Sequence, residues 1–171
     1  MELDEKINAL EFLNSPHLSS VKLLSTNERI IKLWQMEDRK HRQYTNAEVK
    51  GNSVQFPTST VVSQGYEGVD KKLYKNCHNY NINTLSVSPD GENFLSSDDL
   101  CVNLWNFENT NLAYQIVDLK PPNIEELSEV ITHVEYHPKR SDVFLFSSSK
   151  GYICLCDFRV SSQFNKYSTK I

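Results

Sequence analysis

The chain has 171 residues, of which 39% are hydrophobic and 23% are charged, and its formal net charge is −4. This balance is typical of a globular chain, and the negative charge gives no general attraction to nucleic acid. We therefore expect no nucleic-acid partner. No apolar run approaches the ~18 residues of a membrane-spanning helix, so we expect no membrane partner either. The acidic N-terminus lacks a signal-peptide apolar stretch. It predicts a cytoplasmic chain, with the nucleus left open as a second location.

The first predicted unit covers residues 4–36 and alternates apolar and polar residues before and after a turn at 14–17. Leu10 and Phe12 share one face of its first strand, which predicts that both point into the core. A cluster of small residues at 24–27 then precedes a run that ends in Leu-Trp at Trp34. We expect Trp34 to pack in the interior.

An insertion over 37–77 follows, with basic segments at 39–42 and 71–75 and a polar stretch between them. Its length exceeds that of an ordinary connection, and such segments are usually functional or disordered. No aromatic stacking platform for nucleic acid accompanies the basic segments. The pattern therefore favours a solvated arm or a contact with an acidic protein.

The clearest unit covers 78–117. Leu85 and Val87 share a face of its first strand, and Ser-Pro-Asp-Gly at 88–91 predicts a turn. Asp98 and Asp99 form a tight turn before the run that ends in Leu-Trp at Trp105. Residues 112–117 predict a fourth, outer strand. A short helical insertion follows at 121–130, with an Asn at 123 and a Glu at 126 in capping-box spacing.

The third unit covers 131–159, with Val134 and Tyr136 at the predicted core positions and Cys156 where the other units have Trp. His133 and His137 stand four apart, as zinc ligands do on a helix. Here the alternation indicates a strand, which separates them by roughly 13 Å at ~3.3 Å per residue. We therefore expect no metal site and no cofactor.

The four cysteines lie at 77, 101, 154 and 156, and none forms a Cys-x-x-Cys pair. We expect reduced thiols that pack, with a redox role as the alternative. The sequence contains five glycines and no Gly-x-Ser-x-Gly elbow, P-loop or Gly-x-Gly-x-x-Gly motif. It therefore predicts that the chain is not an enzyme.

Three strand–turn–strand units resemble the WD-repeat blades of a β-propeller. The predicted fold is all-β: a partial WD-repeat propeller of about three blades of a seven-bladed ring, with the long inter-blade insertion, over 1–171. Seven blades of ~40 residues need about 280 residues before insertions. We therefore expect three blades to leave open sheet edges and uncovered faces.

The resemblance can be narrowed to one family of WD-repeat proteins. Five runs carry it, at 24–34, 95–105, 116–121, 125–132 and 147–151. They resemble the B-type, 55-kDa regulatory subunit of protein phosphatase 2A, closely over 78–159, moderately over 4–36, and only in position over 37–77. The resemblance implies a propeller without catalysis of its own that joins a scaffold subunit and a catalytic subunit. It also implies recruitment of phosphoprotein substrates with basic segments. The insertion after Trp34 stands where the family has a hairpin-like arm that grips the scaffold.

The resemblance also implies a substrate groove on one face of the propeller, and Asn81 stands where the family usually has His. Carboxylates on a rim attract basic segments, and an exposed Leu beside them offers an apolar socket. Two alternatives stay open: Asp98 orders its turn, and Leu127 anchors its helical turn. The implied substrate-binding residues are Asp99, Leu127, Tyr80, Asp98 and Glu5.

Two other functions fit the same pattern. A generic WD-repeat interaction scaffold would explain why the sequence of 37–77 departs from the family. A truncated, nonfunctional relative that does not fold alone would explain three blades in place of seven.

Overall fold

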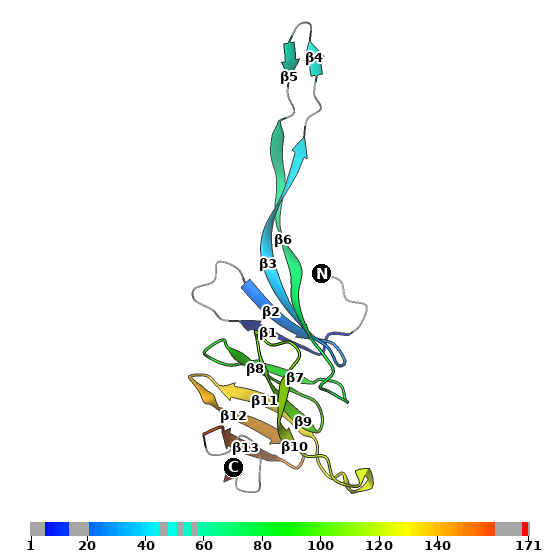
Figure 1. The fold of residues 1–171 in the computed structure, drawn as a ribbon, viewed down its shortest axis with the longest axis vertical. Coiled ribbons are helices and arrows are strands. Elements are labelled where there is room, and N and C mark those ends of the chain that lie inside the picture. Colours follow the sequence, from blue (N-terminus) through cyan, green and yellow to red (C-terminus); the bar gives the residue numbers. More distant parts are fainter. Residues whose placement is uncertain are drawn as a thin grey trace.

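The computed structural model describes residues 6–13, 21–44, 48–50, 53–55, 58–159 and 169–170. They form three four-stranded antiparallel sheets and a separate two-stranded hairpin (Figure 1). Sheet 1 contains β1 (Ala9–Leu13), β2 (Val21–Thr26), β3 (Ile31–Tyr44) and β6 (Ser59–Tyr74). Sheet 2 contains β7 (Thr84–Val87), β8 (Asn93–Ser97), β9 (Cys101–Asn106) and β10 (Ala113–Asp118). Sheet 3 contains β11 (Ile131–His137), β12 (Arg140–Ser148), β13 (Tyr152–Asp157) and β14 (Thr169–Lys170).

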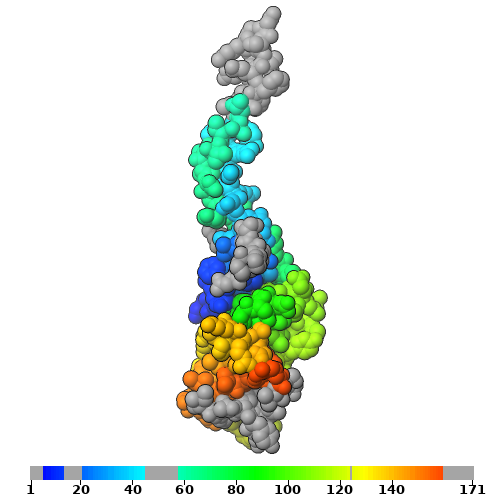
Figure 2. Space-filling model, turned by 90° about the vertical axis from the view of Figure 1, so that its left-hand side faces the viewer, coloured from blue at the N-terminus to red at the C-terminus, as the bar shows by residue number. Residues whose placement is uncertain are grey.

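The sheets follow one another in chain order, and their first strands lie side by side, with β7 in contact with both β1 and β11 (Figures 1 and 2). A radial series of four-stranded antiparallel sheets is the architecture of a β-propeller. The predicted fold class, an all-β partial propeller, is confirmed. The small hairpin consists of β4 (Glu48–Lys50) and β5 (Ser53–Gln55), and a 3₁₀ turn, Ile124–Glu126, lies between sheets 2 and 3. None of the described residues forms a helix long and apolar enough to cross a membrane.

Sheets 1 and 2 bury a core that is rich in aromatic rings. Phe94 stacks on Trp105 with ring centroids 6.0 Å apart, and Tyr74 meets the two rings edge-on at 5.0 and 5.5 Å. The Tyr74 hydroxyl donates a hydrogen bond of 2.9 Å to the carbonyl of Phe107, so its one polar group is satisfied. The buried members of this core are Leu24, Ile31, Leu33, Tyr74, Ile82, Leu85, Phe94, Trp105 and Phe107.

Sheets 2 and 3 bury a second core. Val134 and Tyr136 lie in it as predicted, as do both cysteines of β13, Cys154 and Cys156. Cys156 replaces the Trp of the other units, and Phe144, its register partner on β12, supplies a ring at the same interface. The alternation that predicted these strands therefore also predicted which of their residues are buried.

The same reasoning is wrong for Leu10 and Phe12. Their side chains are 53% and 60% exposed, although they occupy the positions that correspond to Leu85 and Val87. In sheet 2 this face packs on sheet 1, whereas among the described residues no sheet packs on the corresponding face of sheet 1. Alternation predicts that two residues share a face, but a neighbouring sheet decides whether that face is buried.

The segment that the sequence presented as an insertion contains a strand of sheet 1. β3 continues past Met36 and pairs with β6 in an antiparallel ladder from Ile31 opposite Tyr74 to Tyr44 opposite Ser59. We call the part formed by 37–44 and 59–67 the arm; it projects away from the sheets (Figure 1). The C-terminal part of β6 is the fourth strand of sheet 1 and delivers Tyr74 to the core. No sequence pattern indicated this strand, because its residues are mostly polar.

Candidate partner-binding surface

One end of the three sheets carries the connections that contain Asp98, Asp99, Tyr80 and Leu127, four of the implied substrate-binding residues. Because neighbouring strands are antiparallel, the turns 27–30, 98–100 and 149–151 lie at the same end as the inter-sheet connections 75–83 and 119–130. We call these residues together the rim. Backbone bonds tie the connections to the turns: Ile82 N–H to Glu28 at 2.7 Å, Leu119 N–H to Leu100 at 2.9 Å, and Ile131 N–H to Asp99 at 2.7 Å.

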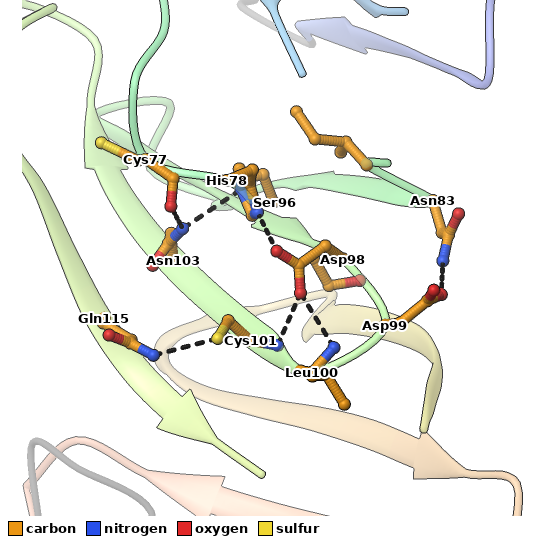
Figure 3. A network of polar contacts seen from close by, with 12 residues as sticks. Cys77, His78, Asn83, Ser96, Asp98, Asp99, Leu100, Cys101, Asn103 and Gln115 are labelled. Carbon is orange, nitrogen blue, oxygen red and sulfur yellow. Dashed lines mark hydrogen bonds and ion pairs between the residues drawn. The ribbon is translucent and has the colours of Figure 1, made fainter. Parts of the chain in front are cut away.

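Asp98 lies beneath the rim and is only 1% exposed (Figure 3). One carboxylate oxygen accepts the N–H groups of Leu100 and Cys101 at 2.8 and 2.7 Å, and the other lies 2.8 Å from Nδ1 of His78. Burial alone would raise the pKa of Asp98, but the bonds from His78 and the two N–H groups outweigh it and hold that pKa below its usual range. This geometry orders the turn and leaves the carboxylate no exposed surface for a partner.

The network continues from Asp98 to the core. His78 Nε2 lies 2.7 Å from the hydroxyl of Ser96, which accepts the indole N–H of Trp105 at 2.8 Å. With Nδ1 protonated toward Asp98, Nε2 accepts the Ser96 hydroxyl proton, so every polar atom in the chain of bonds is paired. Trp34 donates to Ser25 at the same spacing in sheet 1, also at 2.8 Å. The sequence signal for this network is a Ser nine residues before each Trp.

Asp99 points the other way and is partly exposed. Its carboxylate accepts a 2.6 Å hydrogen bond from the side-chain amide of Asn83, which is itself an exposed residue (Figure 3). A carboxylate that accepts one hydrogen bond retains several free acceptor sites. Asn83 was not predicted as a site residue, since nothing in the sequence connected it to a turn 16 residues away.

Leu127 is 40% exposed and follows the 3₁₀ turn. The amide N–H of Glu126 bonds to the carbonyl of Asn123 at 3.0 Å, and their side chains bond to each other at 3.2 Å. The expected capping box is therefore replaced by the i→i+3 bond of a 3₁₀ turn. Exposed carboxylates of Glu125 and Glu126 stand immediately before Leu127.

The C-terminal part of this connection, which contains Ser128 and Glu129, is hydrogen-bonded to sheet 3. Glu129 accepts hydrogen bonds from Ser148, at 2.8 Å, and from the hydroxyl of Tyr152, while Lys150 donates to Ser128 at 2.8 Å. These bonds hold the backbone on the C-terminal side of Leu127 without covering its side chain. An apolar side chain on an anchored loop is available for contact with a partner.

Tyr80 is 38% exposed and lies in the connection 75–83, which His78 and Ile82 secure from below. The structure therefore places Tyr80, Asp99 and Leu127 on one rim, while Asp98 lies buried beneath it. Glu5, the remaining predicted residue, lies outside the described residues.

The arm carries a second candidate surface, which the sequence indicated by its basic segments and by its position after Trp34. On β3, Lys40, Arg42 and Tyr44 alternate onto one face, and the register places Val61 opposite Arg42 and Tyr66 opposite Asp38 on that same face. All of these side chains except that of Asp38 carry cationic or apolar groups, and all are exposed. The opposite face is held by ion pairs of Arg39 with Glu67 and of Lys71 with Glu37.

A cavity of about 430 Å³ lies beside the first strands of the three sheets, lined by Glu11, Phe12, Val87, His133 and Glu135 among others. Burial, and then the charge of Glu135, raises the pKa of Glu11, while His133 lowers it. His133 and His137 are in strand β11, as predicted. No group of three metal-ligating side chains occurs among the described residues.

All four cysteines are free thiols. Burial, and then the nearby carboxylates of Asp98 and Asp118, raises the pKa of Cys101 to about 12. A thiol with such a pKa is almost entirely protonated at neutral pH, and the thiol form is a poor nucleophile.

Comparison with known proteins finds relatives that match nearly the whole chain. The regulatory subunit sur-6 of serine/threonine-protein phosphatase 2A from Caenorhabditis elegans is 41% identical over 171 residues, 93% of this chain. The B beta isoforms of the 55 kDa regulatory subunit from Sus scrofa and Carassius auratus are 40% and 38% identical over 95% and 98% of the chain. The chain is homologous to part of these phosphatase regulatory subunits. The family resemblance predicted from the sequence is thereby confirmed.

This homologue of the regulatory subunits spans only 34%, 39% and 40% of the length of those three relatives. No family model matches the chain. Among solved structures, the β-propeller domain of Cps50 (Swd1) from Myceliophteria thermophila matches with a TM-score of 0.48 and 14% identity, over 95% of this chain and 41% of that one. The fold assignment rests on the three sheets themselves.

Proposed function

We propose that the chain is a non-catalytic regulatory module of protein phosphatase 2A. The observation that carries the proposal is about 40% identity to protein phosphatase 2A regulatory subunits over nearly the whole chain. The three stacked sheets, with exposed connections gathered on one rim, support an adaptor role, because functional residues concentrate on loops held by a rigid scaffold. Its partners would be the scaffold and catalytic subunits, together with phosphoprotein substrates.

The rim is the proposed substrate surface. Asp99, Tyr80 and Leu127 combine a partly exposed carboxylate, a ring and an apolar side chain, and Glu125 and Glu126 add negative charge beside Leu127. Such a surface attracts a basic segment and gives it an apolar anchor. Asp98 acts indirectly, by fixing the turn that presents Asp99. Glu5 keeps its proposed role from the family resemblance alone.

The arm is the proposed scaffold contact. Its exposed face places Lys40 and Arg42 between Tyr44 and Tyr66, a mixture of positive charge and aromatic surface that fits an acidic, partly apolar partner. Because the arm projects away from the rim, the two contacts can be tested separately (Figure 1).

Binding of the purified chain to a purified scaffold–catalytic dimer tests the proposal. We expect saturable binding that Lys40→Glu combined with Arg42→Glu weakens at least tenfold, because each reversal replaces attraction by repulsion. Lys139→Glu, in the exposed turn between β11 and β12 of sheet 3, is the control charge reversal outside the arm and should bind normally. Absence of saturable binding by the wild-type chain would exclude the phosphatase role, and capture of other assemblies instead would favour a generic interaction scaffold.

Substrate recruitment is tested on the same assembly with a basic phosphopeptide. Asp99→Lys should weaken peptide capture several-fold while leaving the dimer contact unchanged. Glu92→Lys, an equal charge reversal in the exposed turn at the opposite end, should leave both unchanged. Equal loss of peptide and dimer binding in Asp99→Lys would mean that Asp99 is structural.

A further inference from the structure

The arm leaves sheet 1 through a bend in β6. At the base of the arm, Leu33 of β3 pairs with Lys72, whereas the next residue of β3 pairs with Asp70. Lys71 is therefore an extra residue on β6, which makes this site a β-bulge. A bulge bends its strand and increases the local twist. We call residues 70–72 the elbow, because they set the direction in which the arm projects (Figure 1).

Immediately after the elbow, β6 is fastened to sheet 2. Lys72 and Tyr74 are two residues apart, so they share the face of β6 that packs on this sheet. The Lys72 ammonium donates to the carbonyl of Phe107 at 2.8 Å and to the carboxylate of Glu108 at 2.9 Å. The Tyr74 hydroxyl donates to the same Phe107 carbonyl at 2.9 Å. We call these four residues the latch.

The part of the latch on sheet 2 is itself held in the core. The ring of Phe107 packs against that of Phe94, with centroids 4.9 Å apart. The Phe107 carbonyl accepts one buried bond, from Tyr74, and one partly buried bond, from Lys72. These shielded bonds contribute more than the ion pair with Glu108, because the Glu108 side chain is 89% exposed and water screens exposed charges.

On the other side of the elbow, the ion pairs join the arm to itself. Arg39 pairs with Glu67, and Lys71 pairs with Glu37. Each pair connects β3 to β6, so it stiffens the two-stranded ribbon. Neither pair reaches sheet 2, and neither fixes the angle between the ribbon and the sheets. That angle depends on the contacts at the base of the arm.

We propose that Lys72 is a positioning residue, which holds the arm at one angle to the three sheets through the latch and so presents the face with Lys40 and Arg42 to its partner. The consequence for binding rests on the proposed scaffold contact, whereas the angle of the arm does not. An arm held at its base loses less conformational freedom on binding than an arm that swings there. The latch therefore raises affinity without touching the partner.

The angle of the arm is measured in the purified chain without a partner. Spin labels attached through p-acetylphenylalanine at Gln43 and Tyr114, two exposed positions on the arm and on β10, give the distance between arm and sheet 2 by double electron–electron resonance. We expect one narrow distance distribution for the otherwise unchanged chain and a broader one for Lys72→Met. Lys72→Arg restores the N–H donors and should restore the narrow distribution.

Lys71→Met is the matched control, because it removes a neighbouring ammonium whose ion pair lies on the arm side of the elbow. It should leave the distribution narrow. Lys72→Met keeps the aliphatic stem of the side chain, so the variant should retain the wild-type circular dichroism spectrum. Equal widths for Lys72→Met and the unchanged chain, or equal broadening by Lys71→Met, would overturn the proposal.

A second variant tests the latch from sheet 2. Glu108→Lys changes an exposed side chain outside the core and replaces attraction by repulsion. It should broaden the same distribution, but less than Lys72→Met does, because the Phe107 carbonyl remains. A distribution as narrow as that of the unchanged chain would contradict the role of the ion pair in the latch.

Binding to the purified scaffold–catalytic dimer tests the consequence. Lys72→Met should weaken binding about three- to tenfold, the cost of ordering a mobile element, while Lys72→Arg and Lys71→Met should bind as the wild type does. A broadened distribution with unchanged affinity would refute the contribution of the latch to binding. A wild-type chain that does not bind the dimer would exclude the phosphatase role, and the distance distributions would still decide whether Lys72 fixes the arm.

Discussion

Asp98 and Asp99 are adjacent in the sequence, but Asp98 is buried and Asp99 is partly exposed. Substituting each of them in turn is the sharpest test of which one orders the rim turn. Asp98→Ala removes the acceptor of three hydrogen bonds, two of them buried, from the His78 ring and the N–H of Leu100, and one part-buried, from the N–H of Cys101. Bonds to a charged acceptor contribute about 1.5–3 kcal/mol each, and partial rearrangement of the turn recovers part of the loss. We expect the free energy of unfolding to fall by about 3–4 kcal/mol, a large share of the ~5–15 kcal/mol of a typical domain.

Asp99→Ala is the matched control, because that carboxylate is partly exposed and accepts one bond, from Asn83. Its cost should stay below about 1 kcal/mol, as for other surface substitutions. In urea, with a slope of about 2 kcal/mol per molar, Asp98→Ala should lower the midpoint by roughly 1.5–2 M at an unchanged slope. The comparison is made at one protein concentration, since association would add to apparent stability. Equal midpoints for the two variants would refute the assignment of Asp98 as the residue that orders the turn.

Two further predictions concern the same core. The folded-state pKa of Asp98 lies below its unfolded value of about 3.9, so its contribution to stability is fully present above that pH and is lost as pH falls through the folded-state pKa. Acid titration of the wild type should therefore show a steeper loss of unfolding free energy below about pH 4 than titration of Asp98→Asn, and parallel curves would contradict this. Tyr74→Phe removes the hydroxyl bonded to the Phe107 carbonyl and should cost about 1 kcal/mol in the same urea assay, whereas Tyr44→Phe on the exposed arm should cost nothing measurable.

The sequence contains a repeated pattern, and the structure shows that the pattern corresponds to strands and turns within each sheet. Period-2 alternation predicted the strands around Leu85 and Val134, and Pro and Gly predicted the turn at 88–91. These are local relations, set by side-chain spacing along one or two neighbouring strands. The family resemblance rested on them and was correct for that reason.

Tyr74 shows where local reasoning ends. It is the last residue of a mostly polar strand in a segment that is inserted between two units, and only the pairing of β6 with β3 carries it into the aromatic core. Asn83 is a similar case, because its contact with Asp99 depends on how a connection crosses a turn. Contacts between segments far apart in the sequence leave no periodic signal in either segment.

The sequence by itself therefore determined the repeated unit and most of its strands, with β6 as an exception, together with the acidic turn and the relationship to phosphatase regulatory subunits. Tertiary structure decided which face of each strand is buried, because burial needs a neighbouring sheet that no single strand specifies. It exposed Leu10 and Phe12 while burying Val134 at the equivalent face. It also separated two adjacent aspartates, one paired beneath the rim and one exposed on it, since neighbours in a turn point in different directions and meet different surroundings.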